Sequence, residues 1–125
     1  MEEPIVSYFF DTYAIIEILK ENPNYEIYKE KIVTITIFNL AEIYGSCSDY
    51  FNEEELDKIY QEYKACLVEI DDLTLKEAIK FRKEHKKQNM SYTDCIGYIY
   101  AKRHSMKFLT GDKEFQNLDN VEFVK

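Results

Sequence analysis

The sequence has few of the residues that interrupt or loosen a fold. It contains only three glycines and two prolines, while aromatic residues, mostly tyrosine and phenylalanine, make up 15% of the chain. Disordered segments are poor in aromatic residues and often rich in proline, so this composition favours a packed fold. We predict one domain spanning residues 1–125, long enough to bury roughly two thirds of its unfolded surface.

Cysteine and histidine are scarce and scattered. Cys47, Cys66 and Cys95 are odd in number and form no paired motif, which argues against a disulfide framework and a zinc knuckle. Buried thiols are the favoured interpretation. His85 and His104 have no neighbouring His or Cys at metal-ligand spacing, so they are interpreted as surface or helix-end residues.

Long apolar runs are missing as well. No run approaches the ~18 residues of a membrane span, and the first four residues, MEEP, lack the charged-then-apolar pattern of a secretory leader. The chain also has no phosphate-cradling glycine loop and no nucleophile elbow. We therefore expect a cytoplasmic protein that does not associate with membranes.

Positive charge is in deficit. The chain has 24 Asp and Glu against 16 Lys and Arg, a formal net charge of −8 at pH 7. This balance argues against a general nucleic-acid binder, whose affinity comes from neutralising phosphates. It is compatible with an enzyme that gathers carboxylates around divalent cations, because the bound ions reverse the local charge.

Short apolar segments alternate with amphipathic ones. The predicted strands are Ile5–Phe10, Val33–Phe38, Cys66–Ile70, Lys107–Thr110 and Val121–Val124. The predicted helices are Thr12–Lys20, Tyr25–Lys31, Glu53–Ala65 and Leu73–Lys87, with two more beginning after caps at Asn39 and Ser91. This alternation predicts an α/β fold with a doubly wound, mainly parallel five-stranded sheet flanked by helices.

Acidic residues recur where predicted strands end or helices begin. Asp11 and Asp112 each follow a strand, Asp94 completes a capping box, and Glu42 takes the third position after the cap at Asn39. Ligands of doubly wound sheets bind beyond the carboxyl ends of the strands. The four acids are therefore expected to converge at one end of the sheet.

Each of these acids also has a purely structural interpretation. A carboxylate at a helix start commonly serves as a cap, so one such acid taken alone is as well explained by capping as by chemistry. Asp71 and Asp72 also follow a predicted strand, and helix capping is the favoured interpretation for them. The functional hypothesis rests on the joint placement of the other four.

Four motifs occur in a telling order and spacing. They are FFDTYAIIEIL at Phe9–Leu19, ITIFNLAEIYG at Ile35–Gly45, SYTDCIGYIYA at Ser91–Ala101 and LTGDKEF at Leu109–Phe115. Each motif alone is weak, but together they span nearly the whole chain. In combination they resemble the PIN domain, the fold of the VapC-type toxins and related ribonucleases.

This resemblance implies a PIN-like three-layer fold and a metal-dependent endoribonuclease that hydrolyses RNA phosphodiester bonds. The implied metal is Mg²⁺ or Mn²⁺, and the implied partners are an RNA substrate, a small antitoxin protein of a VapBC-type pair and a second copy in a homodimer. Carried over by motif, the acidic quartet is Asp11, Glu42, Asp94 and Asp112, with Thr12 and Thr110 as supporting hydroxyls. We expect Asp11 and Asp94 to be principal ligands, Asp112 a further ligand or water-mediated holder, and Glu42 a second ligand or water orienter.

The chemistry explains why carboxylates are needed. Mg²⁺ and Mn²⁺ prefer hard oxygen ligands, and a bound divalent metal lowers the pKa of its water and neutralises phosphate oxygens. Carboxylates held close together are unfavourable without a cation, because like charges disfavour ionisation. We therefore expect metal binding to stabilise the protein.

A basic stretch precedes the Asp94 helix. Lys83, Lys86 and Lys87 are candidate RNA contacts that would steer phosphates toward the acids. Solvated cations at a helix C-terminus explain them equally well. The many tyrosines at helical spacing, such as Tyr60 and Tyr63, are interpreted as core and dimer packing before base-stacking platforms.

Two other functions remain open from the sequence. The first is a PIN-like module that holds RNA or a protein without cutting it. The second is a phosphoacceptor receiver, since doubly wound sheets with acids at strand ends also serve in signalling. A receiver needs an adjacent acidic pair after its first strand, and Asp11 is followed by Thr12.

Overall fold

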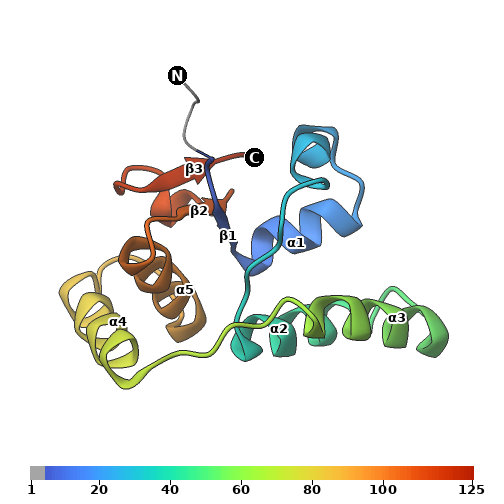
Figure 1. The fold of residues 1–125 in the computed structure, drawn as a ribbon, viewed down its shortest axis with the longest axis horizontal. Coiled ribbons are helices and arrows are strands. Elements are labelled where there is room, and N and C mark those ends of the chain that lie inside the picture. The colour runs from blue at the N-terminus through green and yellow to red at the C-terminus, as the bar shows by residue number, and fades with distance from the viewer. Residues whose placement is uncertain (1–4) are drawn as a thin grey trace.

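The computed structural model describes residues 5–125 and has a short central sheet with helices on both faces (Figure 1). Three parallel strands form the sheet in the order β1-β2-β3: β1 Tyr8–Phe10, β2 Lys107–Thr110 and β3 Val121–Phe123. The predicted class, an α/β fold with a parallel sheet flanked by helices, is confirmed. Residues 1–4, from which the absence of a secretory leader was predicted, lie outside the described part.

Two predicted strands do not form, and two others are shorter than expected. The first strand begins at Tyr8 and not at Ile5, and the last ends at Phe123 and not at Val124. In place of the predicted strands Val33–Phe38 and Cys66–Ile70, the described chain shows one isolated parallel bridge, between Ile35 and Leu67. The prediction of a five-stranded sheet is therefore wrong in number.

The two missing strands still lie beside the sheet. The backbone N–H of Phe10 donates to the carbonyl of Thr34 at 3.0 Å, so the segment around Ile35 borders β1 on the side opposite β2. The segment around Leu67 lies beyond it. Pairing stops early because Thr36 caps a helix at once, which turns the chain out of the sheet after one bridge.

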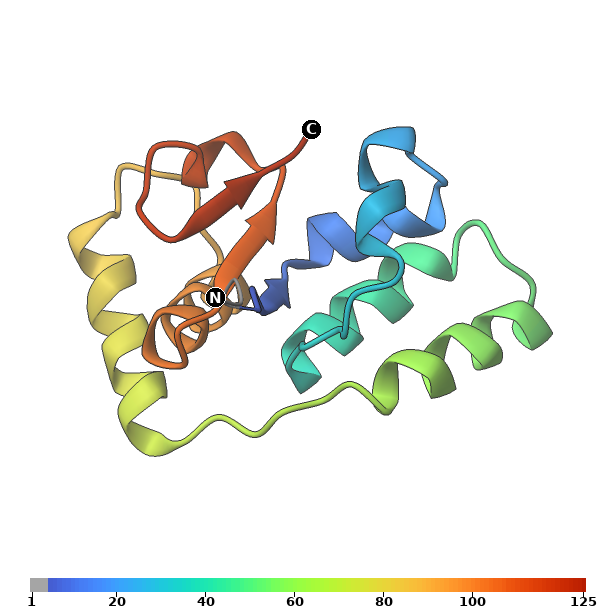
Figure 2. The same ribbon diagram turned by 45° about the horizontal axis from the view of Figure 1, so that its top comes forward.

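Helices cover both faces of the sheet. The α-helices are α1 Thr12–Leu19, α2 Ile37–Cys47, α3 Glu53–Lys64, α4 Asp72–Glu84 and α5 Tyr92–Arg103, and two 3₁₀ helices are η1 Pro23–Tyr28 and η2 Lys113–Phe115. Figure 2 shows α4 and α5 on one side of the strands and α1, α2 and α3 on the other. Within residues 5–125 no helix has the length and apolar character needed to cross a bilayer.

Successive side chains of β1 and β2 point alternately into two cores, one on each face of the sheet. Phe10 and Leu109 point into the core formed with α1, α2 and α3, whereas Phe9 and Phe108 point into the core formed with α4 and α5. All four side chains are fully buried. Each such burial contributes about 1.5–3 kcal/mol, so this period of two fixes which face of each strand meets which helices.

Close contact with the sheet places α5. Gly97 lies in the middle of this helix, and a Cβ there would sit 2.5 Å from Cε1 of Phe9 and 3.2 Å from Cε1 of Phe108. Only the missing side chain lets the helix lie this near the strands. The helix start at Ser91 is thereby held against the carboxyl end of the sheet.

Of the two helix caps predicted at Ser91 and Asn39, one is confirmed and one is wrong. The capping box of Ser91 and Asp94 forms as predicted, with both reciprocal hydrogen bonds present. The prediction that Asn39 caps the following helix is wrong, because Thr36 is the cap and Asn39 is the third helical residue. Glu42 therefore lies within the helix, where capping no longer explains it.

Candidate functional site

The strand order reverses between β1 and β2. After β1 the chain crosses through α1 toward the segment at Ile35, whereas β2 is entered from α5 and continues toward β3 on the other side. In open parallel sheets such a reversal opens a crevice at the carboxyl ends of the strands. Asp11 follows β1 directly, and Asp112 lies two residues beyond the end of β2.

Asp11 is the most deeply buried of the four acids. Its side chain is 2% exposed, and its two oxygens accept hydrogen bonds from the backbone N–H of Thr12 at 2.9 Å and from the hydroxyl of Thr110 at 2.7 Å. Burial, together with the negative charges of Asp94 and Asp112, raises the pKa of Asp11 to about 8, although the two hydrogen bonds act to lower it. The carboxylate form is therefore disfavoured when nothing positive lies nearby.

Thr110 joins the ends of β1 and β2. Its hydroxyl donates to Asp11 and accepts from the backbone N–H of Asp112 at 3.0 Å. Asp112 in turn caps η2, its Oδ1 accepting from the backbone N–H of Glu114 at 3.0 Å. This fully buried threonine thus fixes the two acids relative to each other.

Glu42 is held through Thr12. The Thr12 hydroxyl donates to Oε1 of Glu42 at 2.7 Å and accepts from the amide Nδ2 of Asn39 at 3.0 Å. The Asn39 carbonyl oxygen accepts from the hydroxyl and the backbone N–H of Thr36 at 2.8 and 2.9 Å. Since Asn39 is 1% exposed and anchored on both sides, the Thr12 hydroxyl is oriented toward the glutamate.

Asp94 enters the site from the start of α5. Its Oδ2 accepts from the backbone N–H of Ser91 at 2.9 Å. Burial raises the pKa of Asp94, the hydrogen bonds from Ser91 oppose this, and the negative charges of Asp112 and Glu42 raise it further. Acids from four separate segments therefore lie close enough together for their charges to affect the ionisation of Asp11 or Asp94.

The arrangement leaves carboxylate oxygens available. For Glu42, Asp94 and Asp112, the hydrogen bonds among residues 5–125 engage only one oxygen of each side chain. Within the same part of the chain, however, no three or more Asp, Glu, His or Cys side chains are already arranged as a shell for a metal ion. Carboxylate oxygens are suitable ligands for a hard divalent cation. Such a cation would offset the negative charge that, with burial, raises the pKa of Asp11 and of Asp94.

The predicted basic residues lie at one end of α4. This helix ends at Glu84 and not at Lys87 as predicted, with His85 as its C-cap, so Lys86 and Lys87 lie beyond it. Lys83 and Lys86 line a cavity of about 310 Å³ with Arg82, Gln88 and Met90. Lys87 is not among the residues that line it.

Two residues at the site's margins escape sequence reasoning. Asn39 was interpreted as a helix cap, but it orients Thr12, and only the spacing of a capping box from Thr36 could have indicated its position. Arg82 directly precedes the predicted RNA contact Lys83 in the sequence, and its guanidinium carbon lies 4.1 Å from the ring centroid of Tyr92. No local pattern in the sequence signals that contact.

Comparison with known protein families identifies a match over most of the chain. The sequence model of the PIN domain family matches residues 8–121. No curated protein sequence matches the chain.

Solved structures of similar fold include several toxin–antitoxin complexes. A toxin–antitoxin complex from Klebsiella pneumoniae aligns with a TM-score of 0.76 at 17% identity, covering 93% of this chain and 96% of that chain. VapBC2 from Rickettsia felis, bound to a DNA fragment from its promoter, aligns with a TM-score of 0.69 at 16% identity, covering 96% and 100%. VapBC-1 from nontypeable Haemophilus influenzae gives 0.69 at 18%, covering 94% and 96%. At these identities the likeness shows the fold.

Proposed function

Because the chain belongs to the PIN domain family, we propose that it is a Mg²⁺- or Mn²⁺-dependent endoribonuclease and the toxin of a VapBC-type pair. The observation that carries the proposal is the effect of neighbouring carboxylates on Asp11 and Asp94. Burial raises the pKa of both residues, and the charges of Asp94 and Asp112 raise the pKa of Asp11 further. The charges of Asp112 and Glu42 do the same for Asp94. A site that disfavours its own charge in the absence of cations is suited to bind them.

The acids would share the binding of metal. We assign Asp11 and Asp94 as principal ligands, Asp112 as a further ligand or water-mediated holder, and Glu42 as a second ligand or the group that orients the attacking water. A bound divalent ion would lower the pKa of that water and neutralise phosphate oxygens. The hydroxyl of Thr110 donates to Asp11, which favours the ionised form of that carboxyl. The hydroxyl of Thr12 donates to Glu42 and holds its carboxylate in place.

One observation favours the alternative, a PIN-like module that binds RNA or a protein without cutting. The carboxylates do not form a ready coordination shell within residues 5–125, since Asp94 and Asp112 also serve the starts of α5 and η2. Cleavage therefore requires that these side chains give their free oxygens to a cation while retaining their backbone hydrogen bonds. The two functions differ in what metal does: a nuclease gains activity, whereas the module gains at most stability.

The deciding experiment combines an RNA panel with a metal series. We expect cleavage of at least one single-stranded or structured RNA in Mn²⁺ or Mg²⁺, no cleavage in EDTA, and loss of cleavage in Asp94→Asn. Thermal denaturation in the same metals should show a higher Tm for the wild type, by an amount that grows with the logarithm of metal concentration. Cleavage that survives both EDTA and Asp94→Asn would refute the proposed site.

An antitoxin partner is the second part of the proposal. Its support is that the structures named above are complexes of toxins with antitoxins. A neighbouring reading frame for a small DNA-binding protein would supply the candidate. Co-expression with a tag on that protein should retain this chain on the affinity column and suppress its RNA cleavage.

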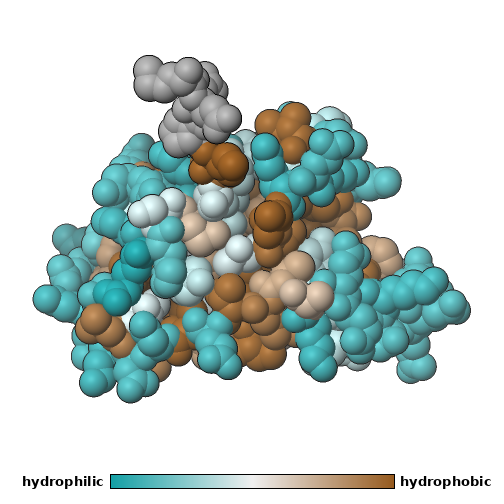
Figure 3. All heavy atoms as spheres, viewed as in Figure 1, coloured by the Kyte–Doolittle hydropathy of each residue, from teal (hydrophilic) through white to brown (hydrophobic). Residues whose placement is uncertain are grey.

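We also propose a homodimer. Exposed apolar side chains support it: Ile37, Phe38 and Leu75 are 54%, 43% and 42% exposed, and all three line one apolar cavity of about 560 Å³. Figure 3 shows hydrophobic side chains gathered where the segment between α3 and α4 passes α2. Apolar patches of this kind mark interaction sites. Sedimentation equilibrium should show a dimer for the wild type and a monomer for Phe38→Glu.

A further inference from the structure

The chain has only two arginines, and they are used differently. Arg103, in the last turn of α5, forms an ion pair with Glu77, in which Nη1 lies 3.0 Å from the carboxylate. Arg82, near the end of α4, donates from Nε to the backbone carbonyl of Met90 at 2.9 Å and stacks over the ring of Tyr92. Within residues 5–125, Arg82 forms no ion pair with an acidic side chain.

The contacts of Arg82 with the described residues fix the position of its guanidinium and leave its terminal N–H groups free to bind a ligand. The carbonyl of Met90 occupies Nε, and the ring of Tyr92 covers one face of the planar group. The N–H groups on both terminal nitrogens make no hydrogen bond to the described residues. A guanidinium fixed in this way presents a fork of donors suited to the oxygens of a phosphate.

The surroundings of this guanidinium are cationic in a protein that is strongly acidic. The cavity of about 310 Å³ beside it is lined by Arg82, Lys83, Lys86, Gln88 and Met90, so three cations and no acid line it. With a formal net charge of −8, the protein repels polyanions as a whole. A concentrated positive cavity would give an anionic ligand one place to approach.

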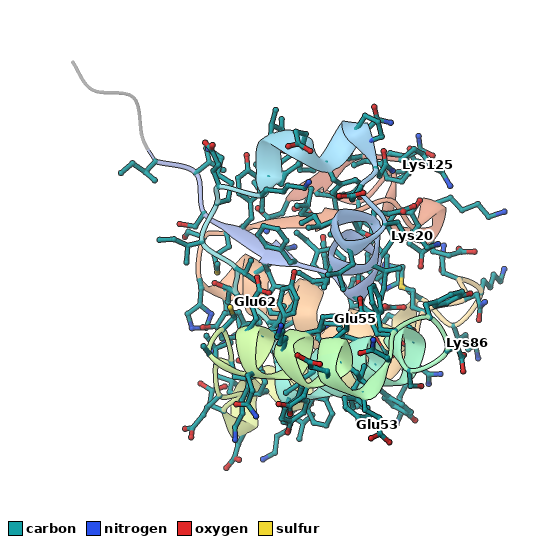
Figure 4. The ribbon with its side chains drawn as sticks, turned by 90° about the vertical axis from the view of Figure 1, so that its right-hand side faces the viewer. Lys20, Glu53, Glu55, Glu62, Lys86 and Lys125 are labelled. Atoms are coloured by element: carbon teal, nitrogen blue, oxygen red, sulfur yellow. The ribbon has the colours of Figure 1, made fainter. Side chains whose placement is uncertain are left out.

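The first turn of α5 connects this cavity with the carboxylates. Tyr92, Arg82's stacking partner, is the first residue of that helix, and Asp94 is the third. Figure 4 shows Lys86 on the same side of the molecule as Lys125, the side toward which β1 runs. Through the contact of Arg82 with Tyr92, the cationic cavity thus adjoins the helix start that carries Asp94.

From this placement we infer that Arg82 and Tyr92 form a nucleotide subsite for single-stranded RNA, separate from the carboxylates. The guanidinium of Arg82 binds a backbone phosphate next to the one being cleaved, and Lys83 and Lys86 add charge around it. Tyr92 as a whole is 55% exposed, which leaves area beside Arg82 on which the adjoining base can stack. The inference rests on the proposed function for its substrate class.

The arrangement also explains why arginine stands at this position. A lysine would keep the charge, but it would lose the planar stack on Tyr92, the fixed bond from Nε to Met90 and the paired donors. Lys83 and Lys86, by contrast, are exposed and act as point charges. We therefore expect Arg82 to make one geometrically specific contact with RNA, whereas any cation could take the place of Lys83 or Lys86.

The test measures RNA binding apart from cleavage. A fluorescently labelled single-stranded RNA of about 12 nucleotides is titrated with the wild-type chain in EDTA at low salt, and the titration is repeated over a series of salt concentrations. We expect Arg82→Gln to weaken binding about tenfold, because stacking and a charge-assisted contact are lost together. The slope of log K against log salt should fall by about 0.7, the loss of one phosphate contact in a single strand.

Two variants separate the specific contact from charge and from folding. Arg103→Gln changes the net charge by the same amount on the neighbouring helix, and it should leave the affinity within about twofold of wild type. Arg82→Lys restores the charge, and it should recover the salt slope but not the affinity. Equal losses in Arg82→Gln and Arg103→Gln, or full recovery in Arg82→Lys, would overturn the subsite, as would wild-type affinity in Arg82→Gln.

Cleavage kinetics distinguish this inference from the proposed function. In Mn²⁺, Arg82→Gln should raise KM for RNA about tenfold while kcat changes little, since the subsite holds substrate and takes no part in the chemistry. If the wild type cleaves RNA and Arg82→Gln has an unchanged KM, the subsite is wrong and the nuclease stands. If no RNA is cleaved in any metal but binding follows the predicted pattern, the nuclease is wrong and the subsite stands.

Discussion

Helices α4 and α5 each have an aspartate at their start, and the two aspartates differ in their surroundings. Asp71 caps α4 and stays exposed, and hydrogen bonding by Thr74 with the nearby positive charge of Arg103 holds the pKa of Asp71 below its usual range. Asp94, in the first turn of α5, is partly buried, and burial with the charges of neighbouring acids raises its pKa. One helix start is an ordinary cap and the other belongs to the candidate site.

The layer in which each helix lies explains this contrast. Helix α5 packs directly on β1 and β2, and Gly97 lets it approach the rings of Phe9 and Phe108. Helix α4 packs mainly on α5, on the side away from the strands. An acid at the start of the inner helix therefore meets the acids at the strand ends, whereas an acid at the start of the outer helix meets solvent.

The largest expected difference between the two helix starts is in activity. Asp94→Asn should lower the rate of RNA cleavage in Mn²⁺ by about 10²-fold or more, because a proposed metal ligand loses its charge. Asp71→Asn should leave the rate unchanged, since asparagine also caps helices well. The comparison fails if both variants cleave at the same rate.

A packing test addresses the approach of α5 to the sheet. Gly97→Ala should lower the free energy of unfolding by about 2 kcal/mol, because the added methyl group overlaps the buried ring of Phe9. Gly45→Ala is the matched control: nothing lies within 4 Å of a Cβ there, so alanine should stabilise α2 by about 0.5–1 kcal/mol. Urea unfolding measures both, and a stabilising Gly97→Ala would contradict the close packing.

The buried and exposed caps should give stability opposite slopes with pH. The pKa of Asp11 is higher in the folded protein than the value of about 4 in the unfolded chain, so its contribution is complete below pH ~4 and is lost as the pH rises toward 8. Asp71 has a lowered pKa, so its contribution is present above pH ~4 and is lost as the pH falls below that value.

Two substitutions read these slopes separately. In metal-free buffer, Asp11→Asn should raise the free energy of unfolding at pH 7 by about 2 kcal/mol. It should also remove most of the increase in the free energy of unfolding that the wild type shows between pH 7 and pH 4. Asp71→Asn should flatten the acid limb alone. Urea unfolding across pH 3–8 measures both, and an unchanged slope in Asp11→Asn would show that its burial does not govern ionisation.

The smallest expected effect concerns the ion pair between α4 and α5. Arg103 and Glu77 join the helices near the exposed cap, with side chains 30% and 44% exposed. Arg103→Gln should cost about 0.5 kcal/mol, since solvent screens such a pair. A double-mutant cycle with Glu77→Gln measures the coupling, and a value of several kcal/mol would mean that the pair holds the helices together.

Local patterns predicted a good deal of this fold. The capping box of Ser91 and Asp94, the strand Lys107–Thr110 and the helix start at Thr12 all follow from residues close in sequence, and the structure contains each of them. The cap of α2 was misplaced by three residues, since Thr36 and Asn39 are both good cap residues. Choosing between them required knowing where the chain leaves the sheet.

By itself, the sequence determined the alternation of strands and helices and the positions of Asp11, Asp94 and Asp112 at strand ends or helix starts, because these depend on periodicity and on turn and cap chemistry within a few residues. Only the tertiary structure decided that Ile35 and Leu67 pair at a single point. It also decided that Asp11 is buried while Asp71 is exposed. Burial and charge–charge effects depend on which layers pack together, and that packing joins residues far apart along the chain.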